Sequence, residues 1–131
     1  MSTGQIILYV IAALVLLSYL RKFLNNKKIT HLDAGDVSKR LKNQNNILLL
    51  DVRTDPERKR GYIKGSLHIP LNQLRKRQPE LEKFKNKEIV CYCRSGNRSL
   101  NAAVFLKKHG FNASNLKGGI TEWNYRNQKP S

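Results

Sequence analysis

The chain opens with a long apolar run and then changes to short apolar segments separated by charged and polar residues. Residues 6–20 contain no charged side chain and no helix breaker, and the apolar span reaches residues 4–24 if Arg21 and Lys22 extend to the membrane surface. A helix of about 20 residues crosses the hydrocarbon core of a bilayer. The pattern therefore predicts a transmembrane anchor over residues 1–24.

A cleaved signal peptide and a buried core helix are the other two interpretations of this segment. A signal peptide carries basic residues before its apolar run and a small-residue cleavage site after it, and this sequence has neither. A core helix is amphipathic, whereas this run is apolar on all sides. We therefore expect residues 4–24 to contact a membrane.

The remainder of the chain shows strand patterns alternating with helix patterns. The expected strands are residues 47–52, a brief strand within 65–70, and residues 88–93 and 111–116. The first expected helix is capped by Asp33 and runs to about Lys42, with Val37 and Leu41 on its inner face. A single turn over 56–60, capped by Asp55, follows the first strand, and two short helices broken near Pro79 lie within 71–85. The last two expected helices are residues 99–109 and a short helix that begins at 118–119 and contains Trp123. Continuous apolar strands that alternate with helices predict a doubly wound, parallel α/β sheet.

The charge distribution supports this division of the chain. All charged side chains lie beyond residue 20, and 25 Lys and Arg against 9 Asp and Glu give a net charge of +16. We expect an anchor at 1–24, a basic linker at 25–28, a folded domain at 29–125 and a flexible tail at 126–131. Basic residues follow the anchor and do not precede it, so the positive-inside rule places the domain in the cytoplasm, in a bacterium at the inner membrane.

The excess positive charge favours anionic partners of several kinds. Small anions and anionic lipid headgroups suit a basic domain beside a membrane. Nucleic acid is disfavoured, because the sequence has no interleaved exposed aromatics and no recognised binding module. The three His residues are scattered, with no metal-site spacing, and we expect neither a metal nor a cofactor.

Cys93 is the leading candidate for chemistry. It follows the expected strand at 88–93, at the carboxyl end where parallel sheets bind ligands, and a helix begins shortly after it. The residues between them form a short polar loop: Arg94, Ser95, Gly96, Asn97, Arg98 and Ser99. Inward backbone N–H groups and the positive end of a helix stabilise a thiolate or another sulfur anion. The alternative is that Cys93 is a small buried residue at a strand end, which is the interpretation we favour for Cys91.

The sequence closely resembles the rhodanese family over residues 29–123. The segment LLLDVRTDPERKRGYIKGSLHIPL (48–71) is similar to the first signature of the family, and IVCYCRSGNRS (89–99) is similar to its active-site signature. The resemblance implies a central, mostly parallel five-stranded sheet with helices on both faces. It also implies a sulfurtransferase in which Cys93 takes sulfane sulfur from thiosulfate or a persulfide donor and passes it to a thiophilic acceptor. A non-catalytic, membrane-tethered interaction module is the alternative.

The length of the loop separates sulfur transfer from a related activity. Cys93 to Arg98 spans six residues, as in the sulfur-handling members, whereas the related cell-cycle phosphatases have seven. The chain departs from the family at Arg58, Tyr62 and Lys64, where an aromatic residue, His and Pro are usual. We expect Arg58 and Lys64 to make the rim of the pocket more cationic, which leaves the substrate open but not the sulfur chemistry.

Two further residues follow the expected strand at 47–52. We expect Asp51 to accept hydrogen bonds that rigidify the neighbouring loops. Arg53 is either an anion contact or a structural brace to Asp51 or Glu57, and the sequence does not choose between these roles. Arg58 is grouped with them as a further candidate for anion contact or brace.

Overall fold

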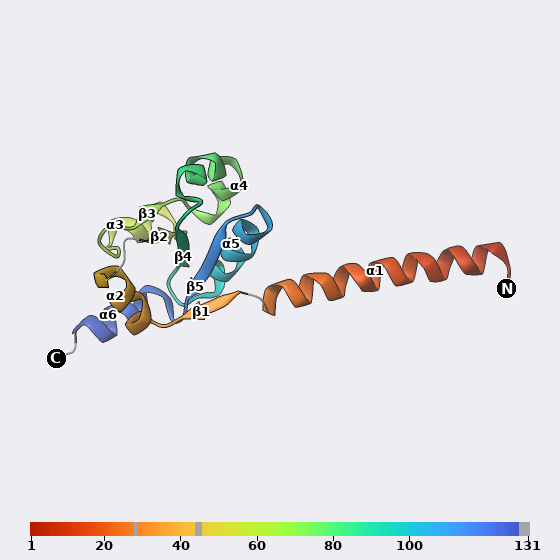
Figure 1. Cartoon of the computed structure of the whole chain (residues 1–131), viewed down its shortest axis with the longest axis horizontal. Coiled ribbons are helices and arrows are strands. Elements are labelled where there is room, and N and C mark those ends of the chain that lie inside the picture. Colours follow the sequence, from red (N-terminus) through yellow and green to blue (C-terminus); the bar gives the residue numbers. More distant parts are fainter. Residues whose placement is uncertain (28, 44–45, 129–131) are drawn as a thin grey trace.

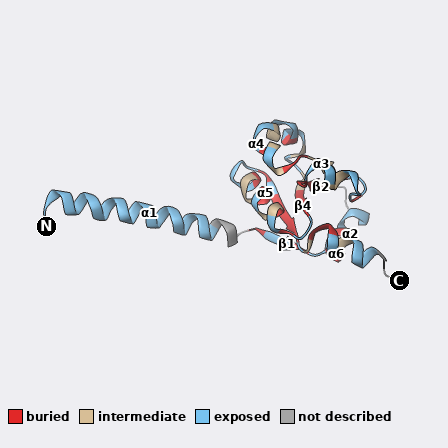
Figure 2. Ribbon diagram, turned by 180° about the vertical axis from the view of Figure 1, so that it is seen from behind, coloured by how far each residue is buried: buried red, intermediate tan, exposed pale blue. Residues whose placement is uncertain are grey.

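The computed structural model describes residues 1–27, 29–43 and 46–128. Helix α1 (Thr3–Lys27) extends away from the remaining elements (Figure 1). Its residues Thr3–Leu24 have a mean hydropathy of 2.0 and are long and apolar enough to cross a membrane. Figure 2 shows them exposed along the described part of the helix. The helix continues through Lys27, so residues 25–27 of the expected linker are helical, and Lys28 lies outside the described residues.

The domain is built on a five-stranded sheet in which every strand pairing is parallel, as predicted. The strands are β1 (Thr30–Leu32), β2 (Ile47–Asp51), β3 (Leu67–His68), β4 (Glu88–Tyr92) and β5 (Asn112–Leu116), in the spatial order β1-β5-β4-β2-β3. Strand β4 is therefore central. Its side chains alternate between the faces, so Ile89, Cys91 and Cys93 join one hydrophobic cluster while Val90 and Tyr92 join the other.

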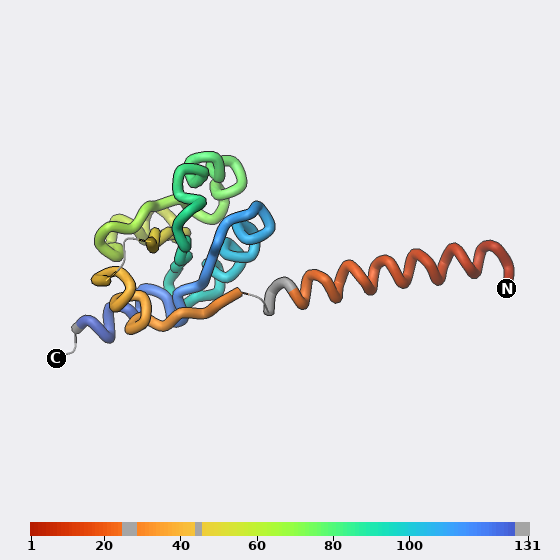
Figure 3. Tube along the Cα trace, in the orientation of Figure 1, coloured from red at the N-terminus to blue at the C-terminus, as the bar shows by residue number. Residues whose placement is uncertain are grey.

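Helices cover both faces of the sheet. The helical elements are α2 (Ala34–Asn43), α3 (Asp55–Lys59), η1 (Leu71–Gln73), α4 (Leu74–Arg77), η2 (Gln78–Phe84), α5 (Asn97–Lys108) and α6 (Gly119–Gln128). Helix α5 packs its small residues Ala102 and Ala103 and its Leu106 into the cluster of Ile89. Helices α2 and α6 lie side by side on the opposite face (Figure 3), where Val37 and Ile120 join Val90.

Three local expectations from the sequence are corrected by the structure. Leu41 is 36% exposed, because only the first part of α2 lies against the sheet, whereas Val37 is fully buried. Thr54 rather than Asp55 caps α3, through a hydrogen bond from Glu57 N–H to its hydroxyl. Helix α6 continues to Gln128, so the first part of the expected tail at 126–131 is helical, and residues 129–131 lie outside the described part of the chain.

Candidate functional site

Cys93 lies directly after the central strand β4, where the chain turns into α5. Gly96 in this turn has φ 113°, a left-handed conformation that glycine adopts at little cost. The turn directs Gly96 N–H toward the sulfur, and it donates a hydrogen bond to Cys93 Sγ at 3.1 Å. The Ser99 hydroxyl lies 3.3 Å from the same sulfur. The loop predicted from the sequence therefore wraps around Cys93, whose side chain is 1% exposed.

Two opposing effects act on the Cys93 thiol. Burial raises its pKa, because the charged form loses water. Hydrogen bonds from the Ser99 side chain and from backbone groups of Ser99, Gly96 and Ser95 stabilise the thiolate, and they hold the pKa of Cys93 below its ordinary value. For Cys91, by contrast, burial in mid-strand raises the pKa, and the neighbouring Cys93 adds to this effect. The two cysteines are two positions apart in the sequence, yet the pKa of Cys93 is lowered and that of Cys91 is raised.

Behind the sulfur lies a hydrogen-bonded chain that the sequence did not predict. Ser99 Oγ donates to Asn115 Oδ1 at 2.6 Å, and Asn115 Nδ2 lies 3.1 Å from His31 Nδ1. Ser99 and Asn115 are buried, whereas His31 lies on the exposed edge strand β1. The parallel register pairs His31 with Asn115 directly across β1 and β5. This partnership could not be predicted because β1 itself was not expected from the sequence pattern.

The guanidinium of Arg98 is bound by Glu57, a second residue that the sequence did not single out for the site. Arg98 Nη1 and Nη2 donate to the two Glu57 oxygens at 2.7 and 2.8 Å. These bonds lower the pKa of Glu57 to about 2. Thr54 N–H and hydroxyl also donate to Glu57 Oε1 in a reciprocal capping box at the start of α3. The spacing Thr-x-x-Glu is the sequence signal that identifies the capping box of Thr54 and Glu57.

Asp51 and Arg53 form a buried brace beside the site. Asp51 is fully buried and accepts hydrogen bonds from Arg53 N, Nε and Nη2 at 2.9–3.0 Å, and from Tyr92 Oη at 3.1 Å. Arg53 Nη2 also donates to the carbonyl of Gly61 at 2.7 Å. Burial raises the pKa of Asp51, but the hydrogen bonds and charge of Arg53 outweigh it, and the net shift is downward. The structure thus shows the bracing contacts of Arg53, and Arg53 also lines the pocket described below, so both roles stay open.

Arg58 is bound to neighbouring residues, and it is not among the residues that line the pocket described below. Its Nη1 donates to Ser66 Oγ at 2.7 Å and to Asp51 at 3.3 Å, and its Nη2 donates to the Ser66 carbonyl. The guanidinium carbon lies 3.7 Å from the centre of the Tyr62 ring. Arg58 and Tyr62 depart from the usual family residues, and here they pack on each other.

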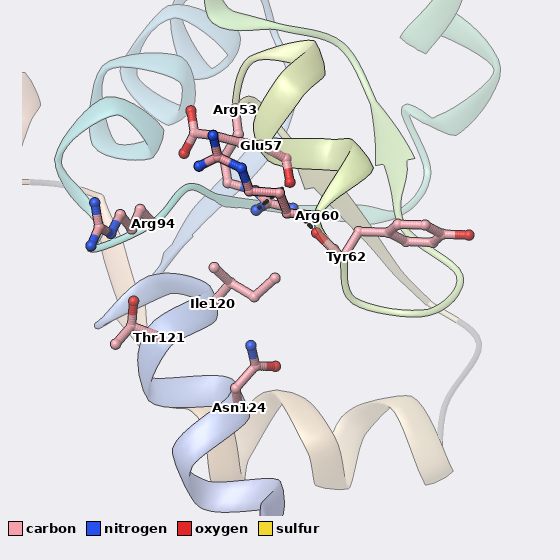
Figure 4. Close-up of a pocket in the computed structure, with 9 residues that line it drawn as sticks. Arg53, Glu57, Arg60, Tyr62, Arg94, Ile120, Thr121 and Asn124 are labelled. Atoms are coloured by element: carbon pink, nitrogen blue, oxygen red, sulfur yellow. Dashed lines mark hydrogen bonds between the residues drawn. The ribbon is translucent and has the colours of Figure 1, made fainter.

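A pocket of about 490 Å³ lies between the segment around α3 and the start of α6. Its lining residues are Arg53, Glu57, Arg60, Gly61, Tyr62, Arg94, Ile120, Thr121 and Asn124 (Figure 4). Arg60 and the loop residue Arg94 are exposed, so the pocket presents two accessible positive charges next to the turn that holds Cys93. In the described part of the chain, no group of His, Cys, Asp and Glu side chains could hold a metal ion.

Comparisons with known proteins agree with this architecture. The family model for the rhodanese-like domain matches residues 19–126. A sulfurtransferase of Allochromatium vinosum is 35% identical over 96 residues, which cover 72% of this chain and 88% of that protein. A tRNA uridine(34) hydroxylase of Buchnera aphidicola is 34% identical over 99 residues, but the match covers only 31% of its length. The crystal structure of a rhodanese-related protein from Thermoplasma volcanium superposes with a TM-score of 0.68 at 33% identity, over 77% of this chain and 95% of the other.

Proposed function

The chain belongs to the rhodanese-like domain family, and from this premise we propose that it is a membrane-tethered sulfurtransferase in which Cys93 carries sulfane sulfur as a persulfide. Its similarity to sulfurtransferases supports rhodanese-type sulfur transfer in general. The observation that carries the finer proposal is the hydrogen bond from Gly96 N–H to Cys93 Sγ, together with the Ser99 hydroxyl group 3.3 Å from the same sulfur. The Gly96 bond and the other backbone groups of the loop stabilise a negatively charged sulfur without a general base.

The proposed reaction has two displacement steps. The Cys93 thiolate attacks the outer sulfur of thiosulfate, the bond between its two sulfur atoms breaks, and sulfite leaves with the electron pair. The resulting persulfide is anionic at neutral pH, with its charge on the outer sulfur, next to the Sγ atom that Gly96 N–H contacts. A thiolate or another thiophilic acceptor then attacks the terminal sulfur, and Cys93 leaves as a thiolate. A persulfide donor reacts in the same way and releases its own thiolate.

Small sulfur-containing anions are the substrates that the neighbouring pocket suits best. The guanidinium groups of Arg60 and Arg94 are exposed there, whereas the Glu57 carboxylate on the pocket wall is neutralised by Arg98. The local charge is therefore positive. Replacing Arg60 or Arg94 with Gln should raise the KM for thiosulfate and leave the unfolding free energy nearly unchanged, because both side chains are exposed.

The proposal is tested by loading the full chain in detergent with thiosulfate. Wild-type protein should gain about 32 Da on the peptide that contains Cys93, the mass of one added sulfur atom. Cys93→Ser should lose both the adduct and turnover, while Cys91→Ala, the matched control, should keep both. Normal turnover in Cys93→Ser would contradict the proposal. A folded wild-type chain that takes up no sulfur from thiosulfate or from a persulfide donor would favour the interaction module instead.

We further propose that α1 crosses the membrane once, with the domain in the cytoplasm. The helix is long and apolar enough, and Arg21 and Lys22 lie near its domain end. Basic side chains of the domain would then lie near anionic lipid headgroups. Protease added to inside-out bacterial membrane vesicles should digest the domain, whereas right-side-out vesicles should protect it. The reverse protection pattern would overturn this orientation.

A further inference from the structure

Four residues from four different elements form a continuous hydrogen-bonded chain that ends on the reactive sulfur. Cys93 follows β4, Ser99 lies in α5, Asn115 in β5 and His31 in β1. The successive distances are 3.3 Å from Sγ to Ser99 Oγ, 2.6 Å from Oγ to Asn115 Oδ1, and 3.1 Å from Asn115 Nδ2 to His31 Nδ1. Cys93, Ser99 and Asn115 are each at most 3% exposed, so water cannot readily replace these bonds.

The Ser99 hydroxyl has a single proton, and this limits what the chain can do. When that proton is donated to Asn115 Oδ1, the Ser99 oxygen can only accept a hydrogen bond from Cys93. This arrangement suits a neutral Cys93 thiol, whose S–H donates to Ser99. An anionic thiolate or persulfide instead needs the Ser99 proton for itself. Asn115 Oδ1 would then face the lone pairs of Ser99 Oγ at 2.6 Å, which is unfavourable. Rotation of the amide removes this conflict, because Nδ2–H then donates to Ser99.

We propose that Asn115 is a positioning residue whose amide turns over when the sulfur of Cys93 changes from the neutral to the anionic form, so that Ser99 donates its proton to sulfur only when sulfur is charged. His31 completes both arrangements: its Nδ1 accepts from Asn115 Nδ2 in the first, and carries a proton and donates to Asn115 Oδ1 in the second. The exposed ring of His31 can exchange protons with water. This inference deepens the proposed function, since the anionic sulfur is the carrier of the transfer reaction.

The amide side chain is the group that fits this role at position 115. An amide offers a donor and an acceptor of nearly equal size at the same place, so turning it over needs little extra space. A carboxylate there could only accept. The neighbouring loop is close but not crowded: a Cβ placed on Gly96 would lie 3.7 Å from Asn115 Nδ2, an ordinary contact distance.

The test measures the reactivity of Cys93 in the full chain, in detergent, without any sulfur donor. The rate of alkylation by iodoacetamide, followed by mass spectrometry of the Cys93 peptide, gives a midpoint in pH at which the thiolate forms. Ser99→Ala should move this midpoint upward by roughly one pH unit, since it removes a hydrogen bond to the charged form. Asn115→Asp should also move it upward, because the carboxylate retains the Ser99 proton.

A double variant separates this mechanism from a simple charge effect. If Asn115 acts through Ser99, the shift caused by Asn115→Asp should be much smaller in the Ser99→Ala background than in the wild type. Asn112→Asp, an exposed Asn on the same strand, is the matched control and should leave the midpoint unchanged. An equal shift in both backgrounds, or no shift in Asn115→Asp, would overturn the proposal.

A second measurement does not depend on any variant of Asn115. At one fixed pH above the alkylation midpoint, ¹⁵N NMR of the wild type should show His31 Nδ1 protonated, while Cys93→Ser, with a neutral hydroxyl, should show it unprotonated. His31→Gln assigns the signal. The same Nδ1 state in both proteins would contradict the proposal. Because neither experiment uses sulfur transfer, a chain that passes both but takes up no sulfur would refute the proposed function alone.

Discussion

Arg98 and Glu57 join the start of α5 to α3 through two parallel hydrogen bonds of 2.7 and 2.8 Å. This pair lies between the two segments that the family signatures mark, the loop after Cys93 and the turn after β2. The Tyr92 hydroxyl ties the same two segments on the other face of the sheet, through hydrogen bonds with Asp51, Ile63 and Ser66. The ion pair therefore ties the start of α5 to α3, and it leaves Arg98 close enough to Cys93 for its charge to act on the sulfur.

Glu57→Gln should reduce the free energy of unfolding by about 1 kcal/mol at neutral pH, the range for a partly exposed bidentate pair. The pKa of Glu57 is about 2 in the fold against an ordinary 4.5, so its contribution is complete above pH 4.5 and is lost as the pH falls toward 2. Urea unfolding of the full chain in detergent, followed by the fluorescence of Trp123, should show the wild type and the variant converging in acid. Glu82→Gln, which breaks an exposed pair with Lys85, is the control and should change stability little. A gap that stayed constant down to pH 2 would contradict this account.

Asp51→Asn should destabilise the domain far more, by about 3–5 kcal/mol, because it leaves the buried guanidinium of Arg53 without its charge partner. The folded state holds the pKa of Asp51 below its ordinary value, so this stabilisation is present at neutral pH and is lost on acidification. The same unfolding experiment measures it, with the exposed Asp36→Asn as the control.

The Arg53 brace itself is tested by comparing stability with kinetics. Arg53→Lys should lower the free energy of unfolding, because an ammonium group cannot reproduce the paired bonds to Asp51 and the bond to the Gly61 carbonyl. A variant with unchanged stability and a raised KM for thiosulfate would instead show that Arg53 contacts substrate.

The contrast between Cys93 and Asn115 shows what the sequence could predict. Cys93 and its loop follow from local order: an apolar strand, a short polar turn with glycine, and a helical pattern. Asn115 lies in the expected strand at 111–116, but its partners depend on the register of β5 against β1 and on the rotation of α5 about its axis. Both are set by tertiary packing. Local patterns place a side chain at the end of an element, whereas contacts across three elements require the assembled sheet.

The N-cap residue of α3 was predicted wrongly from the sequence for a different reason. Thr54 and Asp55 are both good capping residues, and Pro56 is compatible with either choice, since proline is accepted in the first turn. Glu57 decides between them. It stands at the third helical position only if Thr54 is the cap, and from there it reaches back to Thr54 N–H. The Thr-x-x-Glu spacing therefore identifies Thr54 as the cap, whereas the bond between Glu57 and Arg98 depends on tertiary packing.

Gly96→Ala should impair both the fold and the sulfur site. Its φ of 113° costs an L-residue about 1–2 kcal/mol, although an added Cβ would find no atom nearer than 3.6 Å. A turn that relaxes from this conformation redirects Gly96 N–H away from Cys93, so the pH midpoint of Cys93 alkylation should rise. Gly110→Ala is the matched control: φ is 87° at the far end of α5, so it should destabilise similarly and leave the midpoint unchanged. Equal midpoints in all three proteins would show that the turn does not tune the sulfur.

Arg58 and Tyr62, which both differ from the usual family residues, should stabilise the fold through their contact with each other. The guanidinium lies 3.7 Å from the ring centre and also binds Ser66, so removing either partner loses the same contact. In a double-mutant cycle with Arg58→Met and Tyr62→Leu, the losses in unfolding free energy should be less than additive, with a coupling of about 0.5–1 kcal/mol. Lys83 and Phe84 form the control pair: Lys83 Nζ lies 5.3 Å from the centre of the Phe84 ring, and the two residues should couple weakly. Strict additivity at Arg58 and Tyr62 would mean that the two changes are independent, and that the stack seen in the fold adds nothing to its stability.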